Sequence, residues 1–311
     1  MHAQNPGASR RTALVLGAGT ALAAALGTGT AQASAASAPP SAGPRAAARF
    51  RALEERYDAR LGVYAHDVRT GRTLAHRAGE RFPMCSVFKT LAVAAVLRDL
   101  DRDGAFLARR LRYTADCVKR SGWSPVTGEE ENLAHGMTVA ELCDAAIRFS
   151  DNTAANLLLR ELGGPTAVTR FARSLGDPVT RLDRWEPELN SAEPWRTTDT
   201  TTPRAIARTY GRLVLGRALD PGDRALLTDW LLRNTTSDQR FRKGLPPEWT
   251  VADKTGGGEY GGNNDVAVTW PPDGGPVLLA VLTTRPDPEA EPVDELVAAA
   301  AAIAAGELRP V

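Results

Sequence analysis

Hydrophobic and polar residues alternate over residues 61–67, and this period of two is typical of a β-strand with one buried face. The segment Arg69-Thr70-Gly71-Arg72 follows as a turn, and residues 73–76 predict the second strand of a hairpin. From residue 87 to residue 97 only Lys89 is charged. This run predicts a helix that is buried on nearly all sides.

Helical periodicity dominates the middle of the chain. A capping box, Thr138-Val139-Ala140-Glu141, begins a helix that extends to Phe149. Glycine and proline signals delimit four further predicted helices, at residues 153–162, 166–175, 203–215 and 221–233. Residues 177–200 show neither period and contain three prolines. A long irregular segment in a compact domain is usually functional.

Strand-like patterns return near the C-terminus, at residues 249–253, 265–270 and 277–284, before an alanine-rich helix at 293–305. Strands at both ends with helices between them predict an α/β (α+β) fold. We expect one antiparallel sheet built from N- and C-terminal segments with flanking helices. An all-helical lobe of about residues 87–233 is expected as an insertion, with the active site between the two parts.

The N-terminal residues 1–33 have the pattern of an export signal. A twin-arginine pair, Arg10 and Arg11, precedes an apolar stretch, and Ala31-Gln32-Ala33 fits a cleavage site. A retained membrane anchor is the alternative, but Ala, Gly and Thr partition weakly into lipid and favour cleavage near Ala33. We expect a secreted protein with a disordered Ala/Ser/Pro-rich leader at 34–48 and a catalytic domain at 49–311.

Charge argues against a nucleic-acid partner. Cleavage would remove two of the 38 basic residues and none of the 37 acidic ones, which leaves a formal charge of −1. A nucleic-acid binder would show a basic excess. The cysteines and histidines have no metal-ligand spacing, so we predict neither a metal nor another cofactor. The expected partner is a small molecule, and a monomer is the default expectation.

The first candidate catalytic pair is Ser86 and Lys89, at the start of the predicted buried helix. A spacing of three residues puts both side chains on one helix face, where Lys89 can take the serine proton. The helix start also exposes N–H groups to a developing oxyanion. The alternative is a capping serine followed by a lysine that reaches water. The uncharged run around Lys89 favours catalysis, because a lysine there needs partners or a lowered pKa.

Two further motifs carry groups suited to acyl transfer. Ser150-Asp151-Asn152 lies between two predicted helices, where Ser150 can relay a proton to a leaving nitrogen and Asn152 can bind a substrate amide. An ordinary helix cap is the alternative. Lys254-Thr255-Gly256-Gly257 ends a predicted strand. Its glycines permit close backbone approach, an N–H can complete an oxyanion hole, and Lys254 attracts an anionic substrate, whereas the alternative is a glycine-rich turn.

The irregular segment supplies a carboxylate and an amide four residues apart, Glu186 and Asn190, which can hold one water between them. A solvated acidic loop is the alternative. Other hydrolase classes are disfavoured: the chain has no Gly-x-Ser-x-Gly elbow, and no histidine neighbours a candidate serine. It also has no phosphate-binding loop of the Gly-x-x-x-x-Gly-Lys-Ser/Thr kind.

The three signatures Ser-x-x-Lys, Ser-Asp-Asn and Lys-Thr-Gly resemble those of class A β-lactamases, from about Arg49 to the C-terminus. Residues 124–127, 150–158 and 184–190 add to the resemblance, the last as the class A omega loop. The resemblance implies that Ser86 attacks the lactam carbonyl and that the N–H groups of Ser86 and Gly257 hold the oxyanion. Ser150 would then protonate the lactam nitrogen.

The same resemblance implies that Glu186 and Asn190 position the water that frees Ser86. It leaves open whether Lys89 or Glu186 is the base for acylation. It further implies a salt bridge between Arg184 and Asp199, and an aromatic cleft rim at Trp123.

Substrate binding is implied for the Lys-Thr-Gly segment and for an arginine. The family's usual arginine position carries Asn263, and Arg240 fits the alternative place after Asn234-Thr235-Thr236.

The cysteines depart from the disulfides of relatives. Val93 stands where a partner for Cys143 is expected, which predicts a free, buried thiol. Gly258 stands where some carbapenem-hydrolysing members carry a partner for Cys85, so that bridge is not expected.

Two other functions fit the acylation residues. A D-alanyl-D-alanine peptidase, or a β-lactam-binding module that stays acylated, would use the same serine and lysines. Both lack a dedicated deacylating glutamate, so Glu186 and Asn190 favour the β-lactamase.

Overall fold

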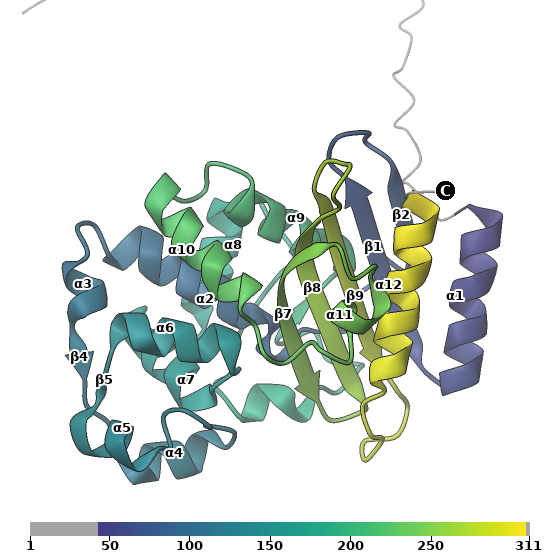
Figure 1. Cartoon of the computed structure of the whole chain (residues 1–311). Coiled ribbons are helices and arrows are strands. Elements are labelled where there is room, and N and C mark those ends of the chain that lie inside the picture. Colours follow the sequence, from purple (N-terminus) through teal and green to yellow (C-terminus); the bar gives the residue numbers. More distant parts are fainter. Residues whose placement is uncertain (1–42, 309–311) are drawn as a thin grey trace, which may run out of the picture. The chain divides into compact units, whose positions relative to one another are not determined.

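Five antiparallel strands form the central sheet of the computed structural model, which describes residues 43–308 (Figure 1). Their order is β2-β1-β9-β8-β7, so strands from both ends of the chain meet at the β1–β9 pair. The strands are β1 (Arg60–Asp67), β2 (Thr73–His76), β7 (Thr250–Gly258), β8 (Gly262–Trp270) and β9 (Val277–Thr284). The prediction of one sheet built from both termini is confirmed.

Helices cover both faces of this sheet. On one face α12 (Asp294–Leu308) packs on the strands, and α1 (Pro44–Tyr57) packs against α12 and β1. On the other face α9 (Pro203–Val214) crosses β1, β8 and β9. Each of these helices turns a row of apolar side chains toward the strands, which places one hydrophobic cluster on each side of the sheet.

The helical part of the chain is built around α2 (Lys89–Ala95), all of whose residues are buried. A 3₁₀ turn, η1 (Cys85–Phe88), precedes it and a π-helical turn, η2 (Val96–Leu100), follows. The surrounding helices are α3 (Ala105–Ala108), α4 (Ala115–Ser121), α5 (Glu130–His135), α6 (Val139–Arg148), α7 (Asn152–Glu161), α8 (Thr166–Ser174) and α10 (Pro221–Leu232). The predicted buried helix is therefore confirmed, although it consists of three helical types in succession.

Short elements complete the fold. Strand β3 (Phe82–Pro83) pairs with β6 (Thr200–Thr201), and β4 (Arg110–Leu111) pairs with β5 (Met137–Thr138). The irregular segment contains one 3₁₀ turn, η3 (Glu188–Ser191), and helix α11 (Phe241–Gly244) precedes β7. The β3–β6 pair matters for the site, because it ties the end of the irregular segment to the strand that leads into η1.

Two sequence predictions need correction. Residues 44–48 are not part of a disordered leader, because α1 begins at Pro44, with a proline suited to a first helical turn. The strand expected at residues 249–253 is longer than its pattern indicates: β7 includes the Lys-Thr-Gly segment, whose backbone pairs with β8, and the strand ends at Gly258. The predicted signal peptide and the first part of the leader lie outside the described residues.

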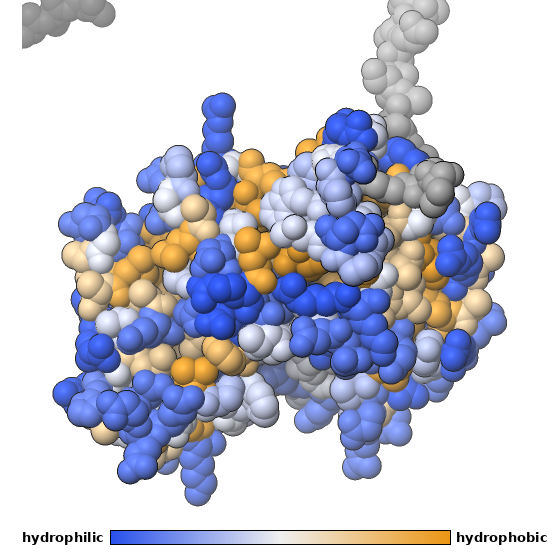
Figure 2. Space-filling model, in the orientation of Figure 1, coloured by the Kyte–Doolittle hydropathy of each residue, from blue (hydrophilic) through white to orange (hydrophobic). Residues whose placement is uncertain are grey.

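The surface is mixed in hydropathy on the face shown in Figure 2. Hydrophilic residues cover most of the side seen in Figure 2, with hydrophobic residues in smaller patches between them. Within residues 43–308, none of the helices has the length and apolar character needed to cross a bilayer.

Gly62 on β1 gives a test of the packing behind the site. A Cβ there would come within 2.5 Å of the Phe82 ring and 2.8 Å of Pro203. We expect Gly62→Ala to lower the free energy of unfolding by about 1–3 kcal/mol through overpacking.

The matched control is Gly222→Ala in α10, where a Cβ meets nothing within 4 Å. Urea denaturation should show this variant unchanged, or stabilised by no more than about 1 kcal/mol. Equal losses in the two variants would contradict the packing argument.

Candidate active site

Ser86 lies in the 3₁₀ turn η1, where the chain leaves β3 and enters the buried helix. The residue is 7% exposed, so little of its surface reaches solvent. Cys85 just before it has a φ of 46°, a left-handed conformation that non-glycine residues rarely adopt. Asn264 on β8 holds this turn, because its Nδ2 donates to the carbonyls of Pro83 (3.0 Å) and Met84 (3.2 Å).

Strand β7 passes directly beside Ser86. A Cβ on Gly256 would lie 2.8 Å from the Met84 carbonyl oxygen and 3.2 Å from the Ser86 nitrogen. Only glycine therefore permits this close approach. A Cβ on Gly257 would meet only the Gly262 carbonyl at 3.8 Å, so that position has room for a side chain. The two glycines therefore differ. At Gly256 only a hydrogen atom fits beside the turn that carries Ser86, whereas at Gly257, the next residue of β7, a side chain would fit.

Lys89 is fully buried and its ammonium is surrounded by oxygen atoms. Its Nζ lies 2.7 Å from the Ser150 carbonyl, 2.7 Å from Asn152 Oδ1 and 3.0 Å from Glu186 Oε1. Ser150 Oγ is at 3.4 Å. Burial lowers the pKa of Lys89 below its usual value, and the Glu186 carboxylate offsets only part of this effect. The lysine thus joins three segments that are distant in sequence.

Glu186 points inward from the irregular segment. Its Oε1 accepts a hydrogen bond from Ser86 Oγ at 3.3 Å, and its Oε2 accepts one from Asn190 Nδ2 at 2.5 Å. Asn156 on α7 binds the Glu186 backbone from both sides, accepting from its N–H (3.1 Å) and donating to its carbonyl (2.8 Å). The carboxylate is therefore positioned by contacts to its side chain and to its main chain.

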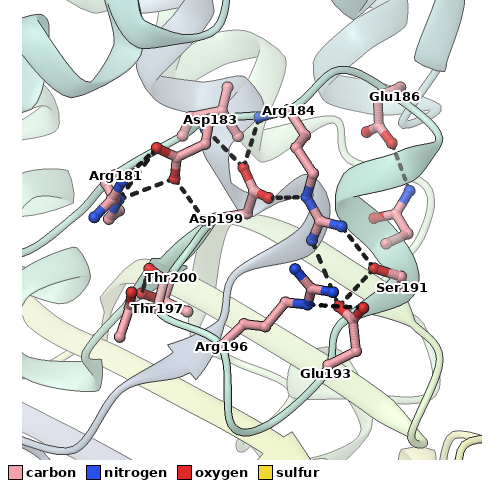
Figure 3. A network of polar contacts seen from close by, with 12 residues as sticks. Arg181, Asp183, Arg184, Glu186, Ser191, Glu193, Arg196, Thr197, Asp199 and Thr200 are labelled. Atoms are coloured by element: carbon pink, nitrogen blue, oxygen red, sulfur yellow. Dashed lines mark hydrogen bonds and ion pairs between the residues drawn. The ribbon is translucent and has the colours of Figure 1, made fainter.

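A polar network fixes the rest of this loop (Figure 3). Arg184 Nε pairs with the buried Asp199 at 2.6 Å, and Asp199 also accepts the N–H groups of Asp183 and Arg184. Ser191 accepts a hydrogen bond from Arg184 and donates to Glu193, which pairs with Arg196. Because the segment has little regular structure, these side chains satisfy backbone groups that a helix or sheet would otherwise pair.

Ser150 occupies the junction between α6 and α7 with a φ of 57°. The neighbouring Asp151 carboxylate is buried and accepts from the Thr127 backbone, the Thr127 hydroxyl and the Ala154 backbone. The predicted loop between two helices is confirmed, and the buried cap of Asp151 holds it in place. The Nδ2 of Asn152 donates to the Ser121 carbonyl at 2.9 Å, while its Oδ1 contacts Lys89.

Strand β7 carries Lys254 and is contacted by Arg240. Lys254 is buried, and burial together with the nearby Lys89 lowers its pKa well below the usual value. Arg240 Nη1 donates to the Gly256 carbonyl at 3.3 Å and to the Asn264 carbonyl at 3.1 Å. Thr255 Oγ1 contacts Thr236 Oγ1 at 2.5 Å. These groups place two cations and two hydroxyls around the strand that approaches Ser86.

Asp294 at the start of α12 orients Arg240, since its Oδ1 accepts from Arg240 Nε at 2.8 Å and from Asn263 Nδ2 at 3.0 Å. Arg240 and Asn263 are the two positions considered above for the substrate-binding arginine, and both donate to the Asp294 carboxylate.

The structure brings Ser86, Lys89, Ser150, Asn152 and Glu186 together in one cluster. Trp123 stands apart: it is 65% exposed, and its Nε1 donates to the Phe149 carbonyl at 3.1 Å.

Sequence reasoning missed three positioning residues, namely Asn156, Asn264 and Asp294. Asn156 had a usable signal, because it follows Asn152 by four residues and so shares its helix face.

All three cysteines are free, and Cys143 is buried as predicted. Burial raises the pKa of Cys85 to about 12. A Cβ on Gly258 would come within 2.8 Å of Cys85 Sγ, so the facing position carries a residue that cannot form a bridge. No cluster of three or more potential metal ligands occurs among residues 43–308.

Comparison with known proteins agrees with this geometry. The model of the β-lactamase enzyme family matches residues 45–308. A β-lactamase of Streptomyces fradiae is 66% identical, with 96% of each chain covered. The solved structure of the β-lactamase from Streptomyces albus G has a TM-score of 0.84 and 65% identity, covering 85% of this chain and 99% of that one. The chain therefore belongs to the β-lactamase enzyme family.

Within this family the fold and the sequence motifs define the class. The protein is a class A serine β-lactamase. A β-lactamase from Desulfarculus baarsii, at 49% identity and a TM-score of 0.82, shares the fold over 86% of this chain and 98% of its own.

Two adjacent glycines of β7 provide a matched test of the site. In Gly256→Ala the new methyl group displaces the Met84 carbonyl and the Ser86 nitrogen, so we expect kcat/KM for a chromogenic cephalosporin to fall about 100-fold or more. Gly257→Ala should stay close to wild type, because its methyl group enters open space.

Thermal unfolding of both variants checks that each is folded. Similar activities in the two variants would show that close approach of β7 to Ser86 is not required.

Proposed function

We propose that the protein hydrolyses the β-lactam ring of penicillin- and cephalosporin-type antibiotics through an acyl-enzyme on Ser86. The contact that supports this proposal is the one between Ser86 Oγ and Glu186 Oε1, at 3.3 Å and away from solvent. It puts a nucleophile and a carboxylate within reach of each other at the start of a buried helix. Acylation and hydrolysis can then occur at the same point.

In the acylation step the Ser86 proton passes to the Lys89–Glu186 pair, whose charged atoms are 3.0 Å apart. Glu186 is the immediate acceptor when Lys89 is an ammonium, and Lys89 is the acceptor when its proton has first moved to Glu186. The Oγ–carbonyl carbon bond forms and the N–H groups of Ser86 and Gly257 stabilise the oxyanion. The carbon–nitrogen bond then breaks, and Ser150 gives its hydroxyl proton to the lactam nitrogen while Lys89, 3.4 Å away, returns to Ser150 the proton that came from Ser86.

In the deacylation step a water held by Glu186 and Asn190 attacks the ester carbonyl. Glu186 takes the proton of the water, the bond to Ser86 Oγ breaks, and Ser86 regains its proton. Asn190 supports this role because its Nδ2 already contacts Glu186 Oε2. Asn156 and the Arg184–Asp199 ion pair keep the carboxylate from turning outward.

Recognition of the substrate carboxylate is assigned to Lys254, Thr255 and Arg240, which surround the strand beside Ser86. A bound carboxylate raises the lowered pKa of Lys254 again, so binding and proton uptake are linked at this residue. Asn152 is assigned to the substrate amide. For this role its Nδ2 exchanges the bond to the Ser121 carbonyl for one to substrate. Trp123 supplies an exposed aromatic face at the cleft rim.

The proposal places the enzyme outside the cell as a monomer. Export rests on the twin-arginine pattern of residues 1–33, with cleavage near Ala33. The substrate is a small molecule, and no cofactor takes part in the chemistry described.

The decisive variant is Glu186→Gln, which keeps the size of the side chain and removes its basicity. We expect the acyl-enzyme to form and then persist, so turnover falls by about 1,000-fold or more. Intact-protein mass spectrometry after mixing with a penicillin should show a stable adduct on the variant and none on wild type.

Glu188→Gln is the control, because Glu188 is an exposed carboxylate of the same loop. It should turn over substrate like wild type. A wild-type enzyme that also stalls as a stoichiometric adduct would favour a β-lactam-binding module or a peptidase instead.

A further inference from the structure

Three arginines of α9 line a cavity of about 260 Å³, whose lining residues do not include Ser86. Arg204, Arg208 and Arg212 are spaced four residues apart, so their side chains project from one face of the helix. The opposite wall is formed by Gly79 and by residues 176–179, at the start of the irregular segment. The cavity thus has a cationic wall and an opposite wall with one acidic residue, Asp177.

None of these three guanidinium groups forms an ion pair within the part of the chain that the structure describes. Arg204 and Arg208 stack against the Tyr64 ring, at 6.0 and 5.8 Å from its centroid. Arg208 Nε reaches the Tyr64 hydroxyl at 3.4 Å, while Arg204 Nε is buried without a hydrogen-bond partner. Among the described residues, three arginines without an ion pair thus line one cavity, and planar guanidinium groups are suited to pairing with a bound oxyanion.

The acidic group that lines the cavity does not neutralise them. The carboxylate of Asp177 accepts from the backbones of Val179 and Thr180 and from the hydroxyls of Thr180 and Thr209. All of its strong acceptor positions are therefore used inside the loop. With three arginines and this one aspartate, the residues that line the cavity carry a net charge of +2.

Neighbouring groups add positive rather than negative charge. Arg81 Nη1 donates to the Val179 carbonyl, and Arg173 Nη1 donates to the carbonyls of Asp177 and Thr180. His66 on β1 faces Arg208: burial lowers the pKa of His66, and the Arg208 charge lowers it further, against a smaller opposing effect of Asp67. The field of the whole region favours an anion.

We propose that this cavity binds a small soluble oxyanion with at least two negative charges, such as a phosphate monoester or pyrophosphate. Planar guanidinium groups match phosphate oxygens with paired hydrogen bonds, and the helical spacing lets Arg208 and Arg212 act on one ligand. The volume lies just below the range of drug-sized sites, which suits a compact anion rather than a large one. The site is separate from the β-lactam chemistry and does not depend on it.

The test is calorimetric titration of pyrophosphate into the purified protein at fixed ionic strength. Wild type should bind one equivalent saturably, and the double variant Arg208→Gln/Arg212→Gln should bind at least about tenfold more weakly. Arg204 is left in place because it is partly buried against Tyr64. The matched control, Arg51→Gln/Arg102→Gln, removes the same charge at exposed arginines and should bind like wild type.

Hydrolysis of a chromogenic cephalosporin should be unchanged in both double variants, which shows that each is folded. Absence of saturable pyrophosphate binding by wild type, or equal weakening in both double variants, overturns the proposal. A binding assay with vesicles that contain or lack phosphatidylglycerol distinguishes a soluble phosphate ligand from the headgroup of a lipid. Binding to the anionic vesicles without binding to free pyrophosphate would place the phosphate on a lipid surface and overturn a soluble ligand.

Discussion

The structure depends on the burial of one ammonium group, that of Lys89. A lysine removed from water is strongly unfavourable unless oxygen atoms replace its hydration shell. Glu186, Asn152 and the Ser150 carbonyl supply these oxygens, from two segments that are distant from Lys89 in the sequence. The same requirement therefore gathers the functional groups: the partners that make burial of Lys89 tolerable are the groups that surround Ser86.

The loop that carries Glu186 shows how much support this arrangement needs. Residues 177–200 have almost no regular structure, and yet their main chain is held at many points by side chains. Asn156 holds the backbone of Glu186, and Asp199 holds the backbones of Asp183 and Arg184. Hydrogen-bonded polar networks of this kind rigidify a segment, even though Asn190 Oδ1 and Thr198 Oγ1 in this loop have no hydrogen-bond partner among the described residues. The rigidity of the carboxylate thus comes from hydrogen bonds rather than from helix or sheet.

Periodicity and capping made much of the fold predictable. The Thr138–Glu141 capping box and the uncharged run after Ser86 are local signals, and both describe the structure correctly. The strand-like pattern before Lys254-Thr255-Gly256 covered only residues 249–253. Pairing with β8 extends β7 through these three residues as well. Helix α1 was assigned in part to a disordered leader, because its contacts with α12 are distant in sequence.

The motifs identified the reacting groups, but the residues that position them could not be found in this way. Asn264 and Asp294 act only after β8 and α12 have packed beside the site, and nothing near them in sequence marks that role. The cavity beside the arginines of α9 could not be predicted either, because residues 176–179, which form its opposite wall, are distant from these arginines in the sequence.

We expect the polar network of the loop to hold Glu186 against Ser86 for the hydrolytic step. Single-turnover stopped-flow measurement of both chemical steps in Asp199→Asn tests it most directly. The variant loses the charge that pairs with Arg184, so deacylation should slow by at least about tenfold more than acylation does. Equal slowing of both steps, or slowing of acylation alone, would contradict the account.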